Sequence, residues 1–196
     1  MKIGLYFGSF NPIHIGHMAI ANYVVEFAAL DQVWFIVSPH NPLKEKSSLL
    51  QDFHRLEMVY KAIDDDPRFR ASDIEFNMPK PSYTIDTLAY LKEKFPDYAF
   101  HLIMGSDNLY YIHKWKNYKE ILSNYGILVY PRPDYPFDIK ELSDLTGNDS
   151  SIRQLEAPLM EISSSFIRKS IKQKIDLRHF LPAEVFRYIE EMHFYE

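Results

Sequence analysis

Short apolar runs alternate with amphipathic stretches along the first 130 residues of the chain. Continuous apolar runs at 3–7 and 33–37 predict buried strands. Between them, hydrophobic positions recur at helical spacing from about Ile15 to Leu30. A strand, a helix and a second continuous apolar strand in this order are typical of a βαβ unit, whose parallel sheet is covered by helices on both faces.

The same alternation continues towards the C-terminus. The pattern predicts helices over 53–63 and 85–95, strands over 69–76, 100–104 and 127–130, and two C-terminal helices over 166–171 and 185–192. Residues 134–151 lose this periodicity, which indicates a loop or connector. We therefore expect a single α/β domain over residues 1–196, with a doubly wound parallel sheet and a helical C-terminal lobe.

Composition narrows the class of protein. The net charge of -5 argues against a broad basic surface, so we expect no nucleic-acid partner and no anionic membrane. The chain has no cysteine, which excludes disulfides, thiolate nucleophiles and cysteine-ligated metal sites. No apolar run approaches the ~20 residues of a membrane span, and the N-terminal run does not resemble a signal peptide. These features predict a soluble cytoplasmic protein and leave homo-oligomerisation open.

The segment GSFNPIHIGH, residues 8–17, follows the first predicted strand. Loops after parallel strands converge at one edge of a sheet, and the N-terminus of the next helix offers unpaired N–H groups to an anion. His14 and His17 stand on either side of Gly16, which leaves room for both imidazoles to point the same way. Alternatively, the histidines cap the turn or pack beneath it, or they bind a metal, although a zinc site needs further ligands.

A second segment suited to binding phosphate is EISSSFIR, residues 161–168. Serines at 163–165 are suited to capping the helix that follows. Arg168 is expected in the first turn of that helix, where the helix dipole disfavours a cation, so an anion partner explains its placement better than a structural role. Hydroxyls, helix N–H groups and a guanidinium together can hold a polyphosphate.

With both segments present, the chain resembles the HxGH nucleotidyltransferases. Further stretches make it similar to the bacterial nicotinate-nucleotide adenylyltransferases: DFHRLEMV, PSYTIDTL, GSDNL with Trp115 shortly after, and YPRPDY. The resemblance implies a Rossmann-like nucleotidyltransferase fold. It implies transfer of AMP from ATP to nicotinate mononucleotide (NaMN), giving deamido-NAD and pyrophosphate, with Mg²⁺ bound mainly through the ATP phosphates and no metal-ligating side chains assigned.

The resemblance also assigns roles to individual residues. His14, His17 and Arg168 would be catalytic. The two histidines would bind the triphosphate and stabilise the transferring α-phosphoryl group, while Arg168 would hold the β and γ phosphates together with Ser163 and Ser165. The ATP site implied in this way comprises Gly8, Ser9, Phe10, His14, His17, Ser163, Ser165 and Arg168.

The assignment of residues to the acceptor site is based partly on the chemistry of their side chains and backbone. Trp115 is expected to be an exposed aromatic that stacks on a pyridine ring, or else an ordinary interface residue. Tyr83 and Thr84 lie at a predicted helix N-terminus, whose N–H groups can receive the nicotinate carboxylate. Asp107 is placed to bind ribose hydroxyls or to cap a helix. In the loop after the second strand, Asn41 and Lys44 are expected at the NaMN phosphate.

Two other interpretations stay open at this point. The same reaction can use nicotinamide mononucleotide (NMN) or phosphopantetheine as acceptor, or the fold can serve as a non-catalytic nucleotide sensor. The chain also departs from its relatives near the acceptor, at Leu43, Met78 and Lys80.

Overall fold

The computed structural model describes residues 1–39, 49–135 and 152–196. Within them a six-stranded sheet has the order β3-β2-β1-β4-β5-β6, and every neighbouring pair is parallel. This is the doubly wound, Rossmann-like order. The chain adds β2 and β3 on one side of β1 and then adds β4, β5 and β6 on the other side, so the strand order switches between β1 and β4. The strands are β1 (Lys2–Gly8), β2 (Gln32–Val37), β3 (Phe69–Ser72), β4 (Ala99–Gly105), β5 (Gly126–Tyr130) and β6 (Ile152–Gln154).

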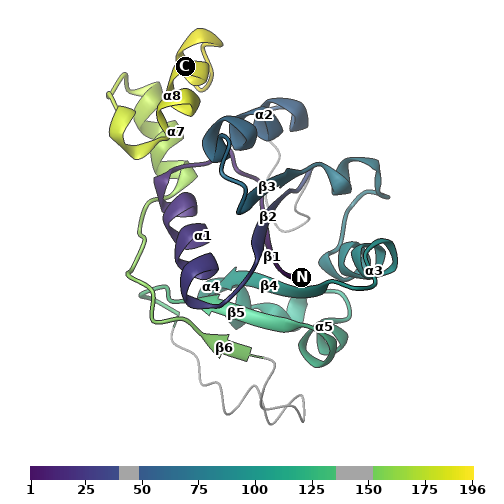
Figure 1. Cartoon of the computed structure of the whole chain (residues 1–196). Helices are drawn as coiled ribbons and strands as arrows, with labels where there is room; N and C mark the ends of the chain where they lie inside the picture. Colours follow the sequence, from purple (N-terminus) through teal and green to yellow (C-terminus); the bar gives the residue numbers. More distant parts are fainter. Residues whose placement is uncertain (40–48, 136–151) are drawn as a thin grey trace.

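Helices cover both faces of the sheet (Figure 1). Helices α1 (Ile15–Phe27) and α2 (Asp52–Ile63) pack on one face. Helices α3 (Thr84–Lys94), α4 (Ser106–Tyr110) and α5 (Tyr118–Asn124) pack on the other. Short 3-10 turns lie at Ile74–Asn77 and Ile112–Lys114.

Strand β2 shows how the sheet separates two hydrophobic cores. Val33, Phe35 and Val37 belong to the cluster under α1 and α2, whereas Trp34 and Ile36 belong to the cluster under α3 and α5. Successive side chains of a strand point to opposite faces, so a strand buried on both sides has no polar position. This explains why the apolar run at 33–37 shows no alternation.

The C-terminal lobe contains α7 (Ser164–Lys172), a 3-10 turn at Arg178–Phe180 and α8 (Ala183–Glu191). Figure 1 shows α7 and α8 together at one end of the molecule, near α2. Buried residues of both helices, Ile167, Val185 and Ile189, join the same hydrophobic cluster as α1 and α2. The single-domain organisation stays a prediction.

The expected strand over 69–76 is too long. β3 ends at Ser72 and a 3-10 turn follows at Ile74–Asn77. The last residue pair between β2 and β3 joins Ile36 to Ser72, one residue before β2 ends, so a longer β3 would have almost no partner strand to pair with.

Other boundaries were also missed. The first helix ends at Phe27 rather than near Leu30, because Ala29 adopts a left-handed φ of 54° that ends the helix. The short elements α4, α5 and β6 were not predicted, since they offer too few residues for a clear period. Of the unperiodic stretch 134–151, residues 136–151 lie outside the described part. The other expected strands and helices are confirmed to within a few residues.

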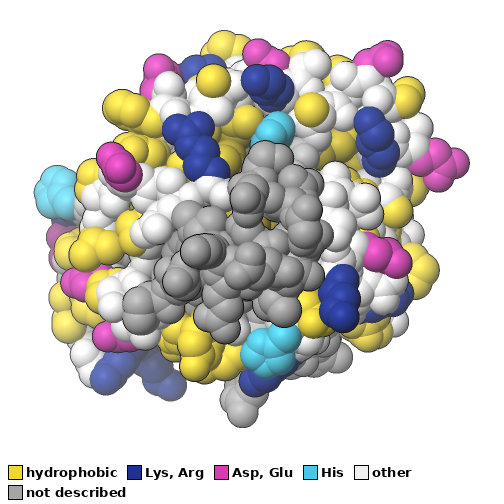
Figure 2. All heavy atoms as spheres, turned by 90° about the horizontal axis from the view of Figure 1, so that it is seen from below, with side chains coloured by type: hydrophobic (Ala, Val, Ile, Leu, Met, Phe, Trp, Pro, Cys, Tyr) yellow, Lys and Arg dark blue, Asp and Glu magenta, His cyan; other side chains and the backbone are white. Residues whose placement is uncertain are grey.

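Helix lengths and the distribution of surface charge both bear on function. In the described parts of the chain, no helix combines the length and apolar character needed to cross a bilayer. On the face seen in Figure 2, the visible Lys and Arg side chains are interspersed with Asp, Glu and hydrophobic side chains and form no broad basic patch.

Candidate active site

The turn from β1 into the start of α1, residues 8–17, carries the first half of the site and is called the histidine loop. Phe10 in this loop has a φ of 44°, and its ring is 2% exposed with its centroid 5.2 Å from that of His17. Gly8 is needed beside it, because a Cβ at residue 8 would lie 2.8 Å from Cζ of Phe10. The Phe10 side chain therefore supports His17 from the core side, while Gly8 and Ser9 line a cavity described below.

The two histidines of the loop are stacked. Their ring centroids are 3.7 Å apart with an interplanar angle of 28°. The backbone N–H of His14 donates to Nδ1 of His17 at 3.2 Å. A ring nitrogen that accepts carries no proton, so the proton of a neutral His17 ring lies on Nε2. The loop thus fixes the tautomer of His17.

His14 is deeply buried, with 4% of its surface exposed. Burial, and secondarily the charge of Arg132, lower the pKa of His14 to about 3. The ring is therefore neutral at pH 7. Its Nδ1 is buried and has no hydrogen-bond partner among the described residues. Gly16 makes this position possible, since a Cβ there would lie 3.1 Å from the same nitrogen.

The N-terminus of α7 meets this loop. Ser163 caps the helix, as expected, by accepting a hydrogen bond from the backbone N–H of Phe166 at 3.2 Å. Ser164 does not cap; its hydroxyl donates to the carbonyl oxygen of Pro12 at 2.9 Å. The hydroxyl thus joins segments 152 residues apart in the sequence.

The expectation for Arg168 is partly wrong. Arg168 is the fifth residue of α7, beyond the first turn, and it has a clear structural partner. Its Nη1 donates to the carbonyl oxygen of Asn11 at 2.8 Å, and its Nη2 donates to Oγ of Ser165 at 3.3 Å. The guanidinium therefore lies against the histidine loop, where the predicted polyphosphate site requires it.

A cavity of about 260 Å³ opens beside this loop, at the carboxyl ends of β1 and β4. This is the edge where ligands bind in doubly wound sheets. Of the predicted site residues, the cavity is lined by Gly8, Ser9, Tyr83, Thr84 and Trp115. These belong to the backbone of the β1 loop and to the acceptor set. The cavity therefore joins two residues of the predicted ATP site, Gly8 and Ser9, to three of the predicted acceptor site.

The remaining predicted residues lie outside this lining, namely Phe10, His14, His17, Asp107, Ser163, Ser165 and Arg168. The histidines and the α7 residues come together at the adjacent loop junction. Asn41 and Lys44 lie outside the described residues.

Trp115 differs from the exposed aromatic that we expected. It is half-buried and packs against the core under α3 and α5 while lining the cavity. The neighbouring lysines line the same cavity and have partners of their own: Lys114 lies over the Tyr111 ring at 4.5 Å, and Lys116 pairs with Asp86 at 2.9 Å. A half-buried indole that packs against the core and lines the cavity is suited to stacking on a planar ligand.

Tyr83 is the N-cap residue of α3 and Thr84 is its first residue, as expected. The first intrahelical N–H groups bond from Asp86 and Thr87 back to the Tyr83 carbonyl. The N–H groups of Thr84 and Ile85 precede this ladder, so the start of the helix suits a carboxylate.

Glu75 was missed by the sequence reasoning. It is 2% exposed, accepts from the hydroxyls of Ser82 at 3.0 Å and Thr87 at 2.7 Å, and lines the cavity. These bonds hold the segment before α3 against the first turns of the helix. A lone Glu between apolar residues gives no local signal of this role.

Arg132 was also missed. Its Nη1 donates to the Met160 carbonyl at 2.7 Å, and its Nε lies 4.0 Å from Oδ1 of Asp107. Asp107 is in the first turn of α4 but does not cap it, because the N-cap residue is Gly105. Arg132 lies two residues after the end of β5, so the rule that loops after parallel strands form the site was a usable signal.

Comparisons with known proteins agree with this arrangement. The Cytidylyltransferase-like family matches residues 5–170. A protein of Flavobacterium psychrophilum named "Probable nicotinate-nucleotide adenylyltransferase" is 52% identical, with 100% of both chains covered. A protein of the same name from Flavobacterium johnsoniae is 53% identical, again with 100% of both chains covered.

Among solved structures, Plasmodium falciparum nicotinic acid mononucleotide adenylyltransferase complexed with NaAD superposes with a TM-score of 0.82. It is 21% identical, and the match covers 99% of this chain and 97% of that one, so it shows the shared fold. The close relatives share about half of their residues with this chain from end to end, and the chain belongs to the nicotinate-nucleotide adenylyltransferase family.

Proposed function

We propose that this chain transfers the AMP moiety of ATP to NaMN, releasing pyrophosphate and giving deamido-NAD. One observation carries the proposal furthest: the histidine loop and the start of α7 are joined by hydrogen bonds from Ser164 to Pro12 and from Arg168 to Asn11. Two phosphate-binding segments far apart in the sequence thereby face one triphosphate. The names of the close relatives support the same reaction.

The chemistry needs no covalent intermediate. A nucleotide phosphate is largely dianionic at pH 7, so an oxygen of NaMN can attack the α-phosphorus of ATP directly. That P–O bond forms while the bond from the α-phosphorus to the bridging oxygen of pyrophosphate breaks. Alignment and stabilisation of charge therefore carry the catalysis.

The predicted ATP residues other than Phe10 have a place in this scheme. His17, protonated at Nε2, donates a hydrogen bond to the transferring phosphoryl group, and neutral His14 supports it. Arg168, Ser163 and Ser165 hold the β and γ phosphates. These roles are supported by the residue chemistry and by the meeting of loop and helix, and Gly8 and Ser9 of the same loop line the neighbouring cavity.

Magnesium stays a prediction. Residues 1–39, 49–135 and 152–196 hold no cluster of His, Asp and Glu side chains that could form a metal site. We therefore propose that Mg²⁺ is held mainly by the phosphates of ATP.

On the acceptor side, we propose that Trp115 stacks on the pyridine ring and that the start of α3 receives its carboxylate at Tyr83 and Thr84. NMN carries a neutral carboxamide there. Hydrogen bonds to a charged group contribute roughly 1.5–3 kcal/mol, which predicts a preference for NaMN of about 10- to 100-fold in kcat/KM.

The test is a substrate matrix. The protein is incubated with ATP, magnesium and one of NaMN, NMN or phosphopantetheine, and both pyrophosphate and the adenylylated product are measured. The proposal expects deamido-NAD as the favoured product. Equal kcat/KM for NMN would contradict the carboxylate assignment, and no pyrophosphate with any acceptor would favour a nucleotide sensor. The ATP requirement and the lack of cysteine fit our proposal that the reaction takes place in the cytoplasm.

A further inference from the structure

Arg55, on the first turns of α2, is a charged residue in the protein interior. It is 0% exposed and is the largest fully buried side chain among the described residues. Burial of an arginine is costly unless every donor finds a partner. Its contacts therefore show which parts of the molecule the guanidinium serves.

All five N–H donors of the Arg55 guanidinium have acceptors. Nε donates to the Leu50 carbonyl at 3.0 Å. Nη1 donates to the carbonyl oxygens of Ser9 at 2.6 Å and Ser38 at 2.8 Å. Nη2 donates to the Pro39 carbonyl at 3.3 Å and to Oδ1 of Asp52 at 2.6 Å. A lysine has three donors and no planar fork, so it cannot reproduce this set.

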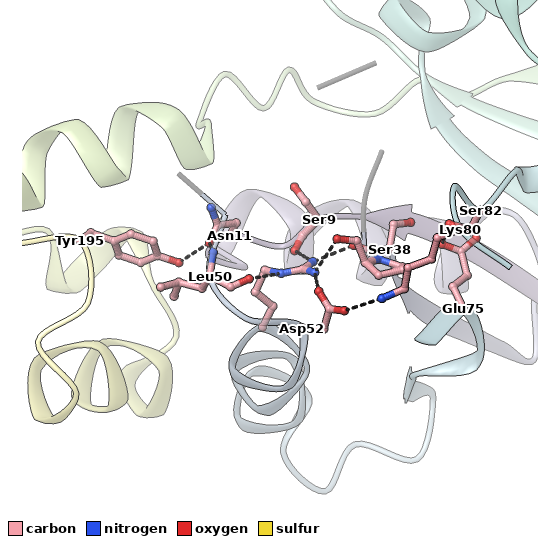
Figure 3. A network of polar contacts seen from close by, with 11 residues as sticks. Ser9, Asn11, Ser38, Leu50, Asp52, Glu75, Lys80, Ser82 and Tyr195 are labelled. Carbon is pink, nitrogen blue, oxygen red and sulfur yellow. Dashed lines mark hydrogen bonds and ion pairs between the residues drawn. The ribbon is translucent and has the colours of Figure 1, made fainter. Parts of the chain in front are cut away.

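The acceptors come from segments that build the site. Ser9 follows β1 in the histidine loop, and Ser38 follows β2. Figure 3 shows Ser9 and Ser38 turned towards the same guanidinium, with Leu50 and Asp52 around it. The Ser38 N–H also donates to the Gly8 carbonyl at 2.9 Å. Gly8, Ser9 and Ser38 all line the cavity at the carboxyl ends of β1 and β4.

Stability alone is a weak explanation for this arginine. Replacing a buried ion pair by apolar residues of similar volume is often neutral for folding. The guanidinium instead satisfies carbonyl groups that face inward from two loops, and one nitrogen fixes the separation of Ser9 and Ser38. A reaction that depends on the alignment of two substrates is sensitive to that separation.

We propose that Arg55 is a positioning residue for adenylyl transfer, which sets the histidine loop after β1 against the loop after β2 so that ATP and the acceptor phosphate align. The inference rests on the proposed function. Arg55 touches no substrate in this scheme; it acts through the backbone of Ser9 and Ser38. Its loss should therefore lower kcat while each substrate still binds.

The test compares Arg55→Lys with Val59→Ala, a substitution at a buried position of the same helix whose side chain has no hydrogen-bonding group. Urea unfolding shows how far each variant is destabilised, and kcat and KM are measured per folded enzyme well below the unfolding transition. Arg55→Lys should lower kcat more than tenfold with both KM values changed less than about threefold. Val59→Ala should keep the wild-type kcat.

A second measurement does not depend on activity. The amide N–H of Ser38 reports on the junction of the two loops, so its hydrogen exchange, followed by NMR, should be at least tenfold faster in Arg55→Lys than in Val59→Ala. If Arg55→Lys does not fold, Asp52→Ala is tested instead. It removes the carboxylate that holds Nη2 of Arg55, so the guanidinium should hold Ser9 and Ser38 less firmly and kcat should fall in the same direction. Asp52 is one-third exposed, so the fold should tolerate its loss.

The outcomes separate the two claims. A kcat of Arg55→Lys equal to that of Val59→Ala overturns the positioning role, and so does faster Ser38 exchange without a fall in kcat. If wild-type protein transfers AMP to no acceptor, the proposed function fails by itself. The Ser38 exchange then decides whether Arg55 holds the loops, and unchanged exchange overturns that claim as well.

Discussion

The backbone N–H of His14 donates a hydrogen bond to Nδ1 of His17, and the two rings stack with centroids 3.7 Å apart. The first histidine thereby orients the second and leaves the proton of a neutral His17 ring on Nε2. This places a defined donor where two distant segments of the chain meet.

Replacement of His17 by alanine is expected to lower kcat by about 10²- to 10³-fold, the usual cost of removing one donor to a charged transition state. The fold should survive, because His17 is half-buried and Phe10 still fills the core beneath it. Steady-state kinetics with NaMN and ATP measure the effect. His179→Ala, at an exposed histidine of the C-terminal lobe, serves as the control. A fall in kcat of less than about threefold would show that the role of His17 is purely structural.

Stability should fall in acid because of His14. Burial lowers its pKa to about 3, against about 6.5 in the unfolded chain. Between these values the unfolded chain binds a proton that the folded chain does not, so the free energy of unfolding decreases as the pH falls from about 6.5 towards 3. The shift corresponds to roughly 4–5 kcal/mol at the acid end.

Urea unfolding of wild-type protein and His14→Gln between pH 7 and pH 4 checks this. The variant should lose up to about 1.4 kcal/mol of pH dependence per pH unit across that window. His193→Gln, at a histidine whose side chain is 76% exposed, should behave like the wild type. Parallel curves for wild type and His14→Gln would refute the prediction.

Trp115→Ala should raise the KM for NaMN about tenfold and leave the KM for ATP nearly unchanged, since stacking on a base contributes roughly 1–3 kcal/mol. Trp115→Phe keeps an aromatic face and should recover most of the affinity. If alanine changes neither KM, Trp115 is an interface residue of the core under α3 and α5.

The hydroxyl of Tyr195 donates to Oδ1 of Asn11 at 2.8 Å, which ties the segment after α8 to the histidine loop. Burial raises the pKa of Tyr195, so the phenol stays a donor at neutral pH. Tyr195→Phe should destabilise the fold by about 1 kcal/mol and lower kcat/KM for ATP several-fold.

A matched control exists in the same lobe. Tyr188 lies 2.8 Å from Nδ1 of His54, away from the histidine loop. Tyr188→Phe should therefore cost similar stability with no change in kcat/KM for ATP. Identical kinetics for the two variants would show that the position of Asn11 in the histidine loop does not depend on its hydrogen bond from Tyr195.

The longer elements were predictable because their signals are local. A buried strand at 33–37 and a helix over 53–63 each follow from periodicity within one short window. The N-cap role of Ser163 and the space left by Gly16 also follow from neighbouring residues. β6 was not predictable, because a strand of three residues has no readable period.

The sequence by itself determined an alternating α/β chain and predicted two segments suited to phosphate, because repeat spacing and side-chain chemistry are properties of short stretches. Only the tertiary structure decided that Arg168 contacts Asn11 and that Arg55 joins Ser9 to Ser38. These residues are 157, 46 and 17 positions apart, so their meeting depends on how α7 and α2 pack against the sheet. A sequence motif shows which chemical groups a segment carries, whereas tertiary packing sets the distances between those groups.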